Sequence, residues 1–166
     1  YNFNELFDPE MGFGDYVKDI IPSDPALRMG QNKYAHGGGT VYKPLSLPDP
    51  KDYMEDATVP GTIGSSSMIR VGLYLEEVFS RNEDKKNFRF MSPDETYSNK
   101  LDRIFNATSR AWQWPVKEWD KDLSRDGRVM EMLSEHNMQG LMQGYVLTGG
   151  HAMFASYEAF VQVVAS

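Results

Sequence analysis

Two short apolar runs, each followed by a segment with helical spacing, decide what this chain can fold into. The first run is Phe88–Met91, and Tyr97–Thr108 follows it with apolar residues three and four positions apart. The second run is Val129–Leu133, and a similar pattern covers His136–Leu147. Parallel strands need a crossover between them, usually a helix. The alternation therefore predicts an α/β fold built on a parallel sheet.

The remaining segments add helices to this plan. Ser65 or Ser66 can cap a helix, and Met68 and Val78 lie on its apolar face. The last residues favour a fourth helix that carries Tyr157, whereas 112–128 has no clear period and predicts a loop. Two strands alone do not make a stable sheet. We therefore expect the missing strands beyond residue 166 or from another chain.

The first 60 residues are different in character. They hold seven of the nine prolines and the run Gly37–Gly39, with one short helix expected over Tyr16–Ile21. So long an irregular stretch is unusual inside a compact domain. We predict an inter-domain linker over 1–60 and a partial α/β domain over 61–166. The chain opens without Met and stops inside an apolar run, so we expect a piece of a longer protein.

Charge and composition exclude several classes of partner. The formal net charge is -7 and the isoelectric point is about 4.9, so no basic surface is available for nucleic acid. Cysteine is absent, which excludes disulfides and thiolate chemistry and favours a cytoplasmic setting. No run of about 18 apolar residues exists, so we expect no membrane partner.

The strongest candidate for chemistry is Glu135. Ligands of open parallel sheets sit beyond the carboxyl ends of the strands. Glu135 follows the second apolar run and begins a helix. Burial would favour its neutral form, whereas a helix N-terminus would favour its anion. Such a carboxyl group can exchange a hydrogen bond with a ring nitrogen, although a simple helix cap explains the same position.

Two further pairs suit a ligand. Ser98 and Lys100 follow the first strand and offer a hydroxyl and an ammonium to an anion such as phosphate. A solvated first helical turn is the alternative. Phe154 and Tyr157, one helical turn apart, could wall a flat heterocycle, or could simply be core residues. His136 and His151 match no zinc spacing with Glu135, so we predict no metal site from these side chains.

Taken together, the motifs resemble the phosphoketolase family over nearly the whole chain, with the blocks in order and at the family's spacing. The resemblance is carried by Phe90–Leu101 (family pattern F-G-P-D-E-T-x-S-N-R-L), Arg128–His136 (L-S-E-H), Gly144–His151 (Y-L-L-T-G-R-H), Ser156–Phe160 (S-Y-E-A-F), Arg28–Gly30 (R-M-G) and Gly37–Gly38 (N-G-G).

The resemblance implies a thiamine diphosphate enzyme related to transketolase, and a pyrimidine-binding role for this chain. Glu135 would then face the aminopyrimidine, Phe154 would stack on it, and Tyr157 would act near the reacting carbon. The sugar phosphate would be held by Ser98 and Lys100. His151 would be a further pocket residue.

The family cleaves xylulose 5-phosphate and, in many members, fructose 6-phosphate with inorganic phosphate, giving acetyl phosphate and an aldose phosphate. Its Mg²⁺ and the cofactor's diphosphate are held by a G-D-G…N motif that this chain does not contain. The resemblance further implies a homodimer or larger assembly, since such sites form between two subunits. We therefore expect the isolated chain to be inactive.

Several positions depart from the family pattern. Lys100 replaces an arginine, so bidentate binding of phosphate is lost while the charge remains. Met91–Ser92 stands where F-G is usual, Gly150 and Ala152 interrupt R-H-G, and His36 replaces an asparagine. Two alternatives therefore stay open, a transketolase-like two-carbon transfer and a non-catalytic regulatory or interaction domain of the same fold.

Overall fold

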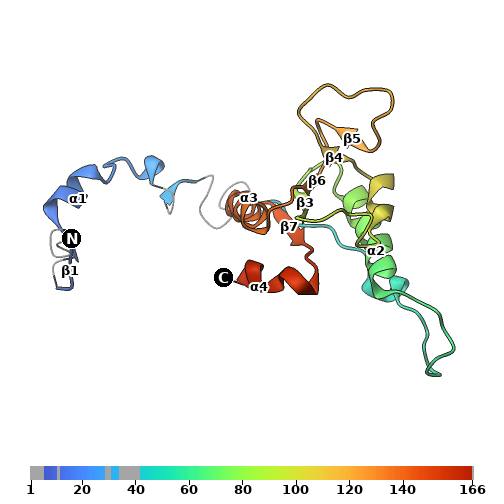
Figure 1. The fold of residues 1–166 in the computed structure, drawn as a ribbon. Helices are drawn as coiled ribbons and strands as arrows, with labels where there is room; N and C mark the ends of the chain where they lie inside the picture. The colour runs from blue at the N-terminus through green and yellow to red at the C-terminus, as the bar shows by residue number, and fades with distance from the viewer. Residues whose placement is uncertain (1–5, 11, 29–30, 34–41, 166) are drawn as a thin grey trace.

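The computed structural model describes residues 6–10, 12–28, 31–33 and 42–165 (Figure 1). The glycine run 37–39, His36 and Met29–Gly30 lie outside these residues. The elements, with η for 3-10 helices, are β1 (Phe7–Asp8), β2 (Gly12–Phe13), α1 (Asp15–Ile20), η2 (Pro25–Leu27), η5 (Pro50–Tyr53), α2 (Ser67–Arg81), β3 (Phe88–Ser92), η6 (Asp102–Asn106), β4 (Arg110–Ala111), β5 (Leu123–Ser124), β6 (Val129–Glu131), α3 (Glu135–Leu147), β7 (His151–Phe154), η7 (Glu158–Phe160) and α4 (Val161–Ala165).

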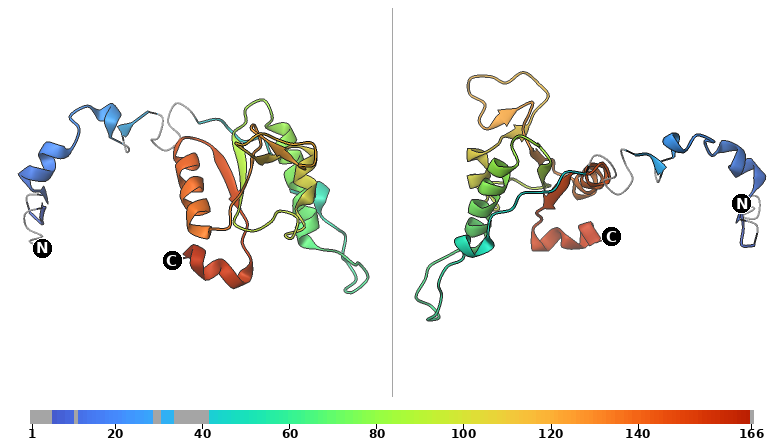
Figure 2. Two further views of the ribbon diagram at one scale, coloured as in Figure 1. Left: turned by 45° about the horizontal axis from the view of Figure 1, so that its top comes forward. Right: turned by 180° about the vertical axis from the view of Figure 1, so that it is seen from behind.

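A parallel sheet with helices on both faces confirms the predicted α/β class. Its five strands run in the order β5-β4-β6-β3-β7, and every pairing is parallel. Helix α2 covers one face and α3 the other, as the two views of Figure 2 show. The predicted helices at α1, α2 and α3 are also present, and Ser66 stands at the N-cap of α2.

Three strands that were expected from outside the chain lie within it. The loop predicted over 112–128 contains β5, and β4 lies just before it. Strand β7 pairs with β3 where no strand was predicted. Strands of two residues, such as β4 and β5, carry no measurable period in a sequence, and the four residues of β7 reach only the shortest length at which alternation can be seen. Their existence depends on neighbours already in the sheet.

The helix predicted over 97–108 was also wrong. That stretch forms a turn followed by the 3-10 helix η6, and Lys100 takes a left-handed backbone conformation with φ of 60°. A non-glycine residue in that conformation interrupts a right-handed helix. Leu101 and Ile104 are nevertheless fully buried. Their spacing therefore records burial against the core and not helical structure.

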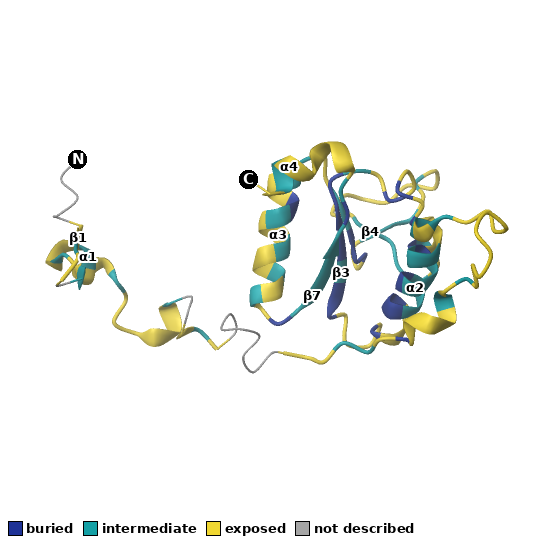
Figure 3. Ribbon diagram, turned by 90° about the horizontal axis from the view of Figure 1, so that it is seen from below, coloured by how far each residue is buried: buried dark blue, intermediate teal, exposed yellow. Residues whose placement is uncertain are grey.

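The core lies almost entirely on the α2 face of the sheet. Phe79 of α2 packs edge-to-face on Phe88 of β3, with ring centroids 5.0 Å apart. Figure 3 shows the buried residues concentrated on β3 and on the inner side of α2. Helix α3, by contrast, buries only Met138. Since burial of apolar area is the main favourable term in folding, the two faces contribute unequally to stability.

Side chains from outside α2 cap its carboxyl end. Asn82 Nδ2 donates to the Val78 carbonyl oxygen at 2.8 Å. Arg128, which is 1% exposed, donates from Nη1 and Nη2 to the Phe79 oxygen at 3.2 and 3.1 Å. Arg128 also forms an ion pair with Glu83. Burial lowers the pKa of the Arg128 guanidinium. These donors satisfy carbonyls that have no partner inside the helix.

The segment from residue 42 onwards runs along this unit. Ser46 exchanges two hydrogen bonds with the Asn82 side chain, at 2.9 and 2.8 Å, and Asn87 Nδ2 donates to the Lys43 oxygen at 3.0 Å. The predicted division between residues 60 and 61 stays a prediction. Within the described ranges, none of the helices is both long and apolar enough to cross a bilayer.

Candidate functional site

Three neighbouring strands end at one edge of the sheet. In the register of the sheet, Ser92 of β3 is paired with Glu131 of β6, and Met91 of β3 with Phe154 of β7. Since these strands are parallel, the segments that leave their carboxyl ends start close together. This is the edge where ligands of open parallel sheets bind. All predicted site residues except His151 lie on or just beyond it.

The structure joins two candidates that the sequence offered separately. Tyr157 Oη donates a hydrogen bond to Ser98 Oγ at 2.5 Å, across 59 residues of sequence. Ser98 Oγ in turn donates to the Glu95 oxygen at 2.8 Å. Both side chains are exposed enough to meet a ligand, with Tyr157 37% exposed. Each hydroxyl has a single O–H donor, so a phosphate oxygen would bind here by replacing the Glu95 oxygen as the acceptor of the Ser98 hydroxyl.

The predicted helical relation between Phe154 and Tyr157 was wrong. Phe154 is the last residue of β7, and Tyr157 precedes the short helix η7. Phe154 is partly buried, so its ring is neither a core residue nor fully solvated. The two aromatic side chains still leave the same strand end, which keeps them together at the edge.

Glu135 is the first residue of α3, and its neighbour Ser134 provides the cap. Ser134 Oγ accepts a long hydrogen bond from the Asn137 N–H at 3.4 Å. The side chain of Glu135 is partly buried and has no hydrogen-bond partner among the described residues. Its carboxylate is therefore available to a ligand, at a helix end that favours negative charge.

The turn that carries Ser98 also carries Lys100 and fixes its backbone. The Lys100 carbonyl oxygen packs against α2 at Gly72, where an added Cβ would lie 3.3 Å from it. Its ammonium is exposed and unpaired among the described residues. Lys100 therefore places a free positive charge two residues from Ser98, as an anion site needs.

His151 is not brought together with the other candidates. It begins β7, about 10 Å along the strand from Phe154. Its Nε2 lies 2.9 Å from the Lys43 oxygen, and its ring packs edge-on against Tyr42. At the neighbouring position, Gly150 replaces the arginine of the family pattern. It packs tightly, since a Cβ there would lie 2.4 Å from Tyr145 Cε1.

Sequence reasoning missed Glu131. It ends β6, and its carboxylate accepts hydrogen bonds from the Thr96 N–H at 2.8 Å and from Arg110 Nε at 2.5 Å. The available signal was a single acidic residue inside an otherwise apolar run, four positions before Glu135. A charge in such a place is rarely buried without a partner.

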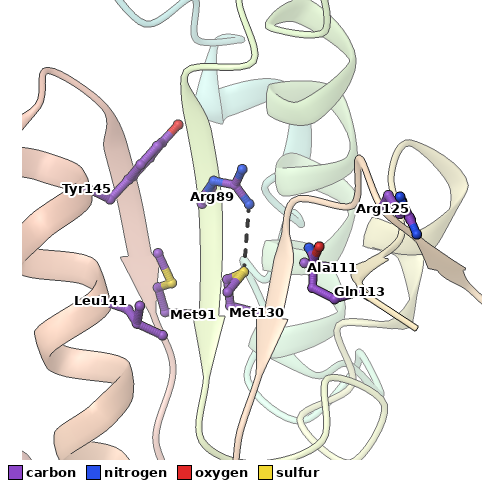
Figure 4. A pocket seen from close by; sticks show the side chains of 8 residues that line it. All are labelled: Arg89, Met91, Ala111, Gln113, Arg125, Met130, Leu141 and Tyr145. Carbon is purple, nitrogen blue, oxygen red and sulfur yellow. Dashed lines mark hydrogen bonds between the residues drawn. The ribbon is translucent and has the colours of Figure 1, made fainter.

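A hollow of about 250 Å³ lies on the α3 face of the sheet (Figure 4). It is lined by Arg89, Met91, Ala111, Gln113, Arg125, Met130, Leu141 and Tyr145. Figure 4 shows Arg89 directed toward the Met130 sulfur, 3.7 Å away. None of the predicted site residues lines this hollow, although Met91, which is paired with Phe154 in the sheet, does. Among the described residues, no group of three or more His, Cys, Asp and Glu could hold a metal ion.

The fold and this edge define a parallel α/β domain whose site is assembled from the segments that follow its strands. The sequence profile of the family described as D-xylulose 5-phosphate/D-fructose 6-phosphate phosphoketolase matches residues 69–166. This chain belongs to that family.

Curated relatives resemble the chain along its full length. It is 43% identical to a "Probable phosphoketolase" of Rhodopseudomonas palustris (strain BisB5), over 100% of this chain and 21% of the relative. A protein of the same description from Gloeobacter violaceus is 42% identical over the same shares, and one from Nitrosospira multiformis is 43% identical over 100% of this chain and 20% of its own. The chain thus spans about a fifth of the length of the relatives it matches.

Proposed function

We propose that the full-length protein is a thiamine diphosphate-dependent phosphoketolase, a carbon–carbon lyase, and that this chain supplies the pyrimidine-facing part of its site. The substrates would be xylulose 5-phosphate, or fructose 6-phosphate, together with inorganic phosphate. The observation that supports this most is the Tyr157–Ser98 hydrogen bond. It joins Tyr157, which is predicted to line the cofactor pocket, to Ser98, which is predicted to bind the sugar phosphate. Both lie at the edge of the sheet where Glu135 begins α3.

The residues at this edge fit one half of the cofactor and not the other. Glu135 offers a carboxylate with no partner in the described part of the chain, and Phe154 offers a partly exposed ring, which suit a flat nitrogen heterocycle. No described cluster suits Mg²⁺. In the proposal, Mg²⁺ and the diphosphate are held by another part of the full-length protein or by a partner subunit in a dimer or larger assembly.

The side chains have distinct tasks in this scheme. Glu135 would accept a hydrogen bond from a pyrimidine nitrogen and hold or release a proton at its carboxylate. When bound, thiamine diphosphate supplies the electron sink for carbon–carbon cleavage. Ser98 and Lys100 would bind the sugar phosphate, with the Ser98 hydroxyl donating to a phosphate oxygen in place of the Glu95 oxygen and Tyr157 donating to Ser98 Oγ. Lys100 provides a point charge where a guanidinium would bind phosphate bidentately.

The test uses the full-length protein with thiamine diphosphate, Mg²⁺, xylulose 5-phosphate and inorganic phosphate, and measures acetyl phosphate. Glu135→Gln should lower kcat by roughly 10²–10⁴-fold, the usual contribution of a positioned acid–base group. Glu118→Gln, on an exposed loop, is the matched control and should change little. Unchanged turnover in Glu135→Gln would refute the assigned role.

Two further outcomes distinguish the alternatives. Transfer of the two-carbon unit to an aldose in place of acetyl phosphate formation would indicate a transketolase-like enzyme. No turnover by the wild-type full-length protein would favour a non-catalytic domain. The 166-residue chain alone should form no acetyl phosphate, and turnover by that chain would contradict a site completed from elsewhere.

A further inference from the structure

The carboxylate of Glu131 connects the sheet to the turn that bears Ser98. Glu131 is the last residue of β6, and its side chain is 19% exposed. One oxygen, Oε1, accepts the backbone N–H of Thr96 at 2.8 Å. The other, Oε2, accepts Arg110 Nε at 2.5 Å. Each carboxylate oxygen therefore accepts a hydrogen bond from a different donor.

Arg110 is itself held from several sides. Its side chain is 18% exposed, and its guanidinium lies over the Phe105 ring, 4.2 Å from the centroid. The Asp122 carboxylate lies 3.9 Å from Nη1. A guanidinium fixed by an aromatic face and a second carboxylate cannot easily follow Glu131 if that side chain moves. Arg110, held by these other contacts, therefore restrains the Glu131 carboxylate.

Two side chains also tie this turn to neighbouring segments, since Tyr97 Oη donates to Asp122 Oδ2 at 2.7 Å and Ser98 Oγ accepts from Tyr157. Thr96 is completely buried, yet its hydroxyl has no hydrogen-bond partner among the described residues. The Ser92 hydroxyl and one Asp94 oxygen are likewise buried and without a partner there. Buried polar groups are normally paired, and exceptions gather where structure serves a site. Among the described residues, the bond from the Thr96 N–H to Glu131 is the anchor that joins the backbone of this turn to strand β6.

The anchor lies two residues from Ser98, whose hydroxyl meets Tyr157 at 2.5 Å. A hydroxyl must be held closely to favour a bound phosphate, because small displacements weaken a hydrogen bond steeply. We propose that Glu131 is a positioning residue, which, through Arg110 on one side and Thr96 on the other, sets the place of Ser98 for the sugar phosphate. This inference rests on the function proposed above.

The decisive variant is Glu131→Gln in the full-length protein. Glutamine has the same shape but only one acceptor oxygen, so it cannot accept from both Thr96 and Arg110. We expect KM for xylulose 5-phosphate to rise about tenfold, the effect of one lost hydrogen bond, with kcat changed roughly twofold or less. Arg110→Met removes the same anchor from its other side and should act in the same direction. Glu83→Gln, which changes another arginine-paired carboxylate, is the control and should leave KM unchanged.

A double variant distinguishes a positioning role of Glu131 from a general effect on structure. Ser98→Ala alone should also raise KM about tenfold, and Glu131→Gln together with Ser98→Ala should raise it no further, because both remove the same contact. Multiplied effects in the double variant, or an unchanged KM in Glu131→Gln, would overturn the proposal.

Hydrogen–deuterium exchange tests the Glu131 anchor independently of whether the protein has phosphoketolase activity. Exchange over residues 93–100 of the full-length protein should rise in Glu131→Gln and Arg110→Met but not in Glu83→Gln, whether or not the protein turns over. An unchanged exchange rate in that segment would overturn the anchor itself. If wild type forms no acetyl phosphate but the exchange result holds, the proposed function fails and the anchor stands.

Discussion

Replacement of Arg128 by methionine tests the buried cap at the end of α2. Methionine fills a similar space but offers no donor, so the Phe79 oxygen loses both hydrogen bonds of 3.2 and 3.1 Å. An unpaired buried carbonyl costs about 1–3 kcal/mol, and loss of a cation at a helix carboxyl end costs up to about 2 kcal/mol. Relief from burying the charge offsets part of this cost. We therefore expect a net loss of about 2–3 kcal/mol.

Urea unfolding of the 166-residue chain, followed by circular dichroism, measures this loss. With a slope of about 2 kcal/mol per molar urea, the midpoint should fall by about 1 M. Glu83→Gln is the matched control, since that side chain is 55% exposed and its pairing with Arg128 contributes about 1 kcal/mol or less. A cost below about 0.5 kcal/mol for Arg128→Met, or a larger cost for Glu83→Gln, would show that the cap does not stabilise α2.

Other positions make simpler tests. Gly140→Ala, in α3 with nothing within 4 Å of the new Cβ, should stabilise the chain by about 1 kcal/mol in the same unfolding assay. Gly127→Ala should destabilise it by about 3 kcal/mol, because its Cβ would lie 2.3 Å from the Arg110 backbone; equal midpoints for these two variants would contradict the packing described. The hydrogen bond from Ser65 is the main cause that lowers the pKa of Glu55, so Ser65→Ala should raise that pKa in an NMR titration, and no change would refute the assignment. The lowered pKa stabilises the chain above the ordinary carboxyl value, and this stabilisation is lost as pH falls through the pKa of the folded state.

The elements that sequence reasoning found are those whose burial is periodic. Helix α2 packs an apolar face against the sheet, and β3 is a mostly buried apolar run. Their sequence patterns were therefore sufficient to predict a helix and a strand. The 97–108 stretch misled for the same reason. Leu101 and Ile104 are as buried as helix residues would be, but the left-handed backbone at Lys100 leaves no trace in the apolar pattern.

The individual candidate residues of the site could be chosen from the sequence, but the contacts between them could not. Glu135 is visible from its place between an apolar strand and a helix. The contact between Ser98 and Tyr157 depends on the pairing of β7 with β3, and nothing in one sequence gives the register of two strands so far apart. Glu131 stayed hidden because its partners, Thr96 and Arg110, come from two other segments.

The unequal faces of the sheet have a consequence for the carboxyl group that begins α3. That helix buries Met138 alone, while Leu141 and Val146 are 43% and 46% exposed. Helices with so little burial open at low free-energy cost, and anything that covers their outer side stabilises them by mass action. In the proposed assembly, a polypeptide that covers α3 would therefore also order Glu135, so that assembly and the ordering of this carboxylate would be one coupled equilibrium.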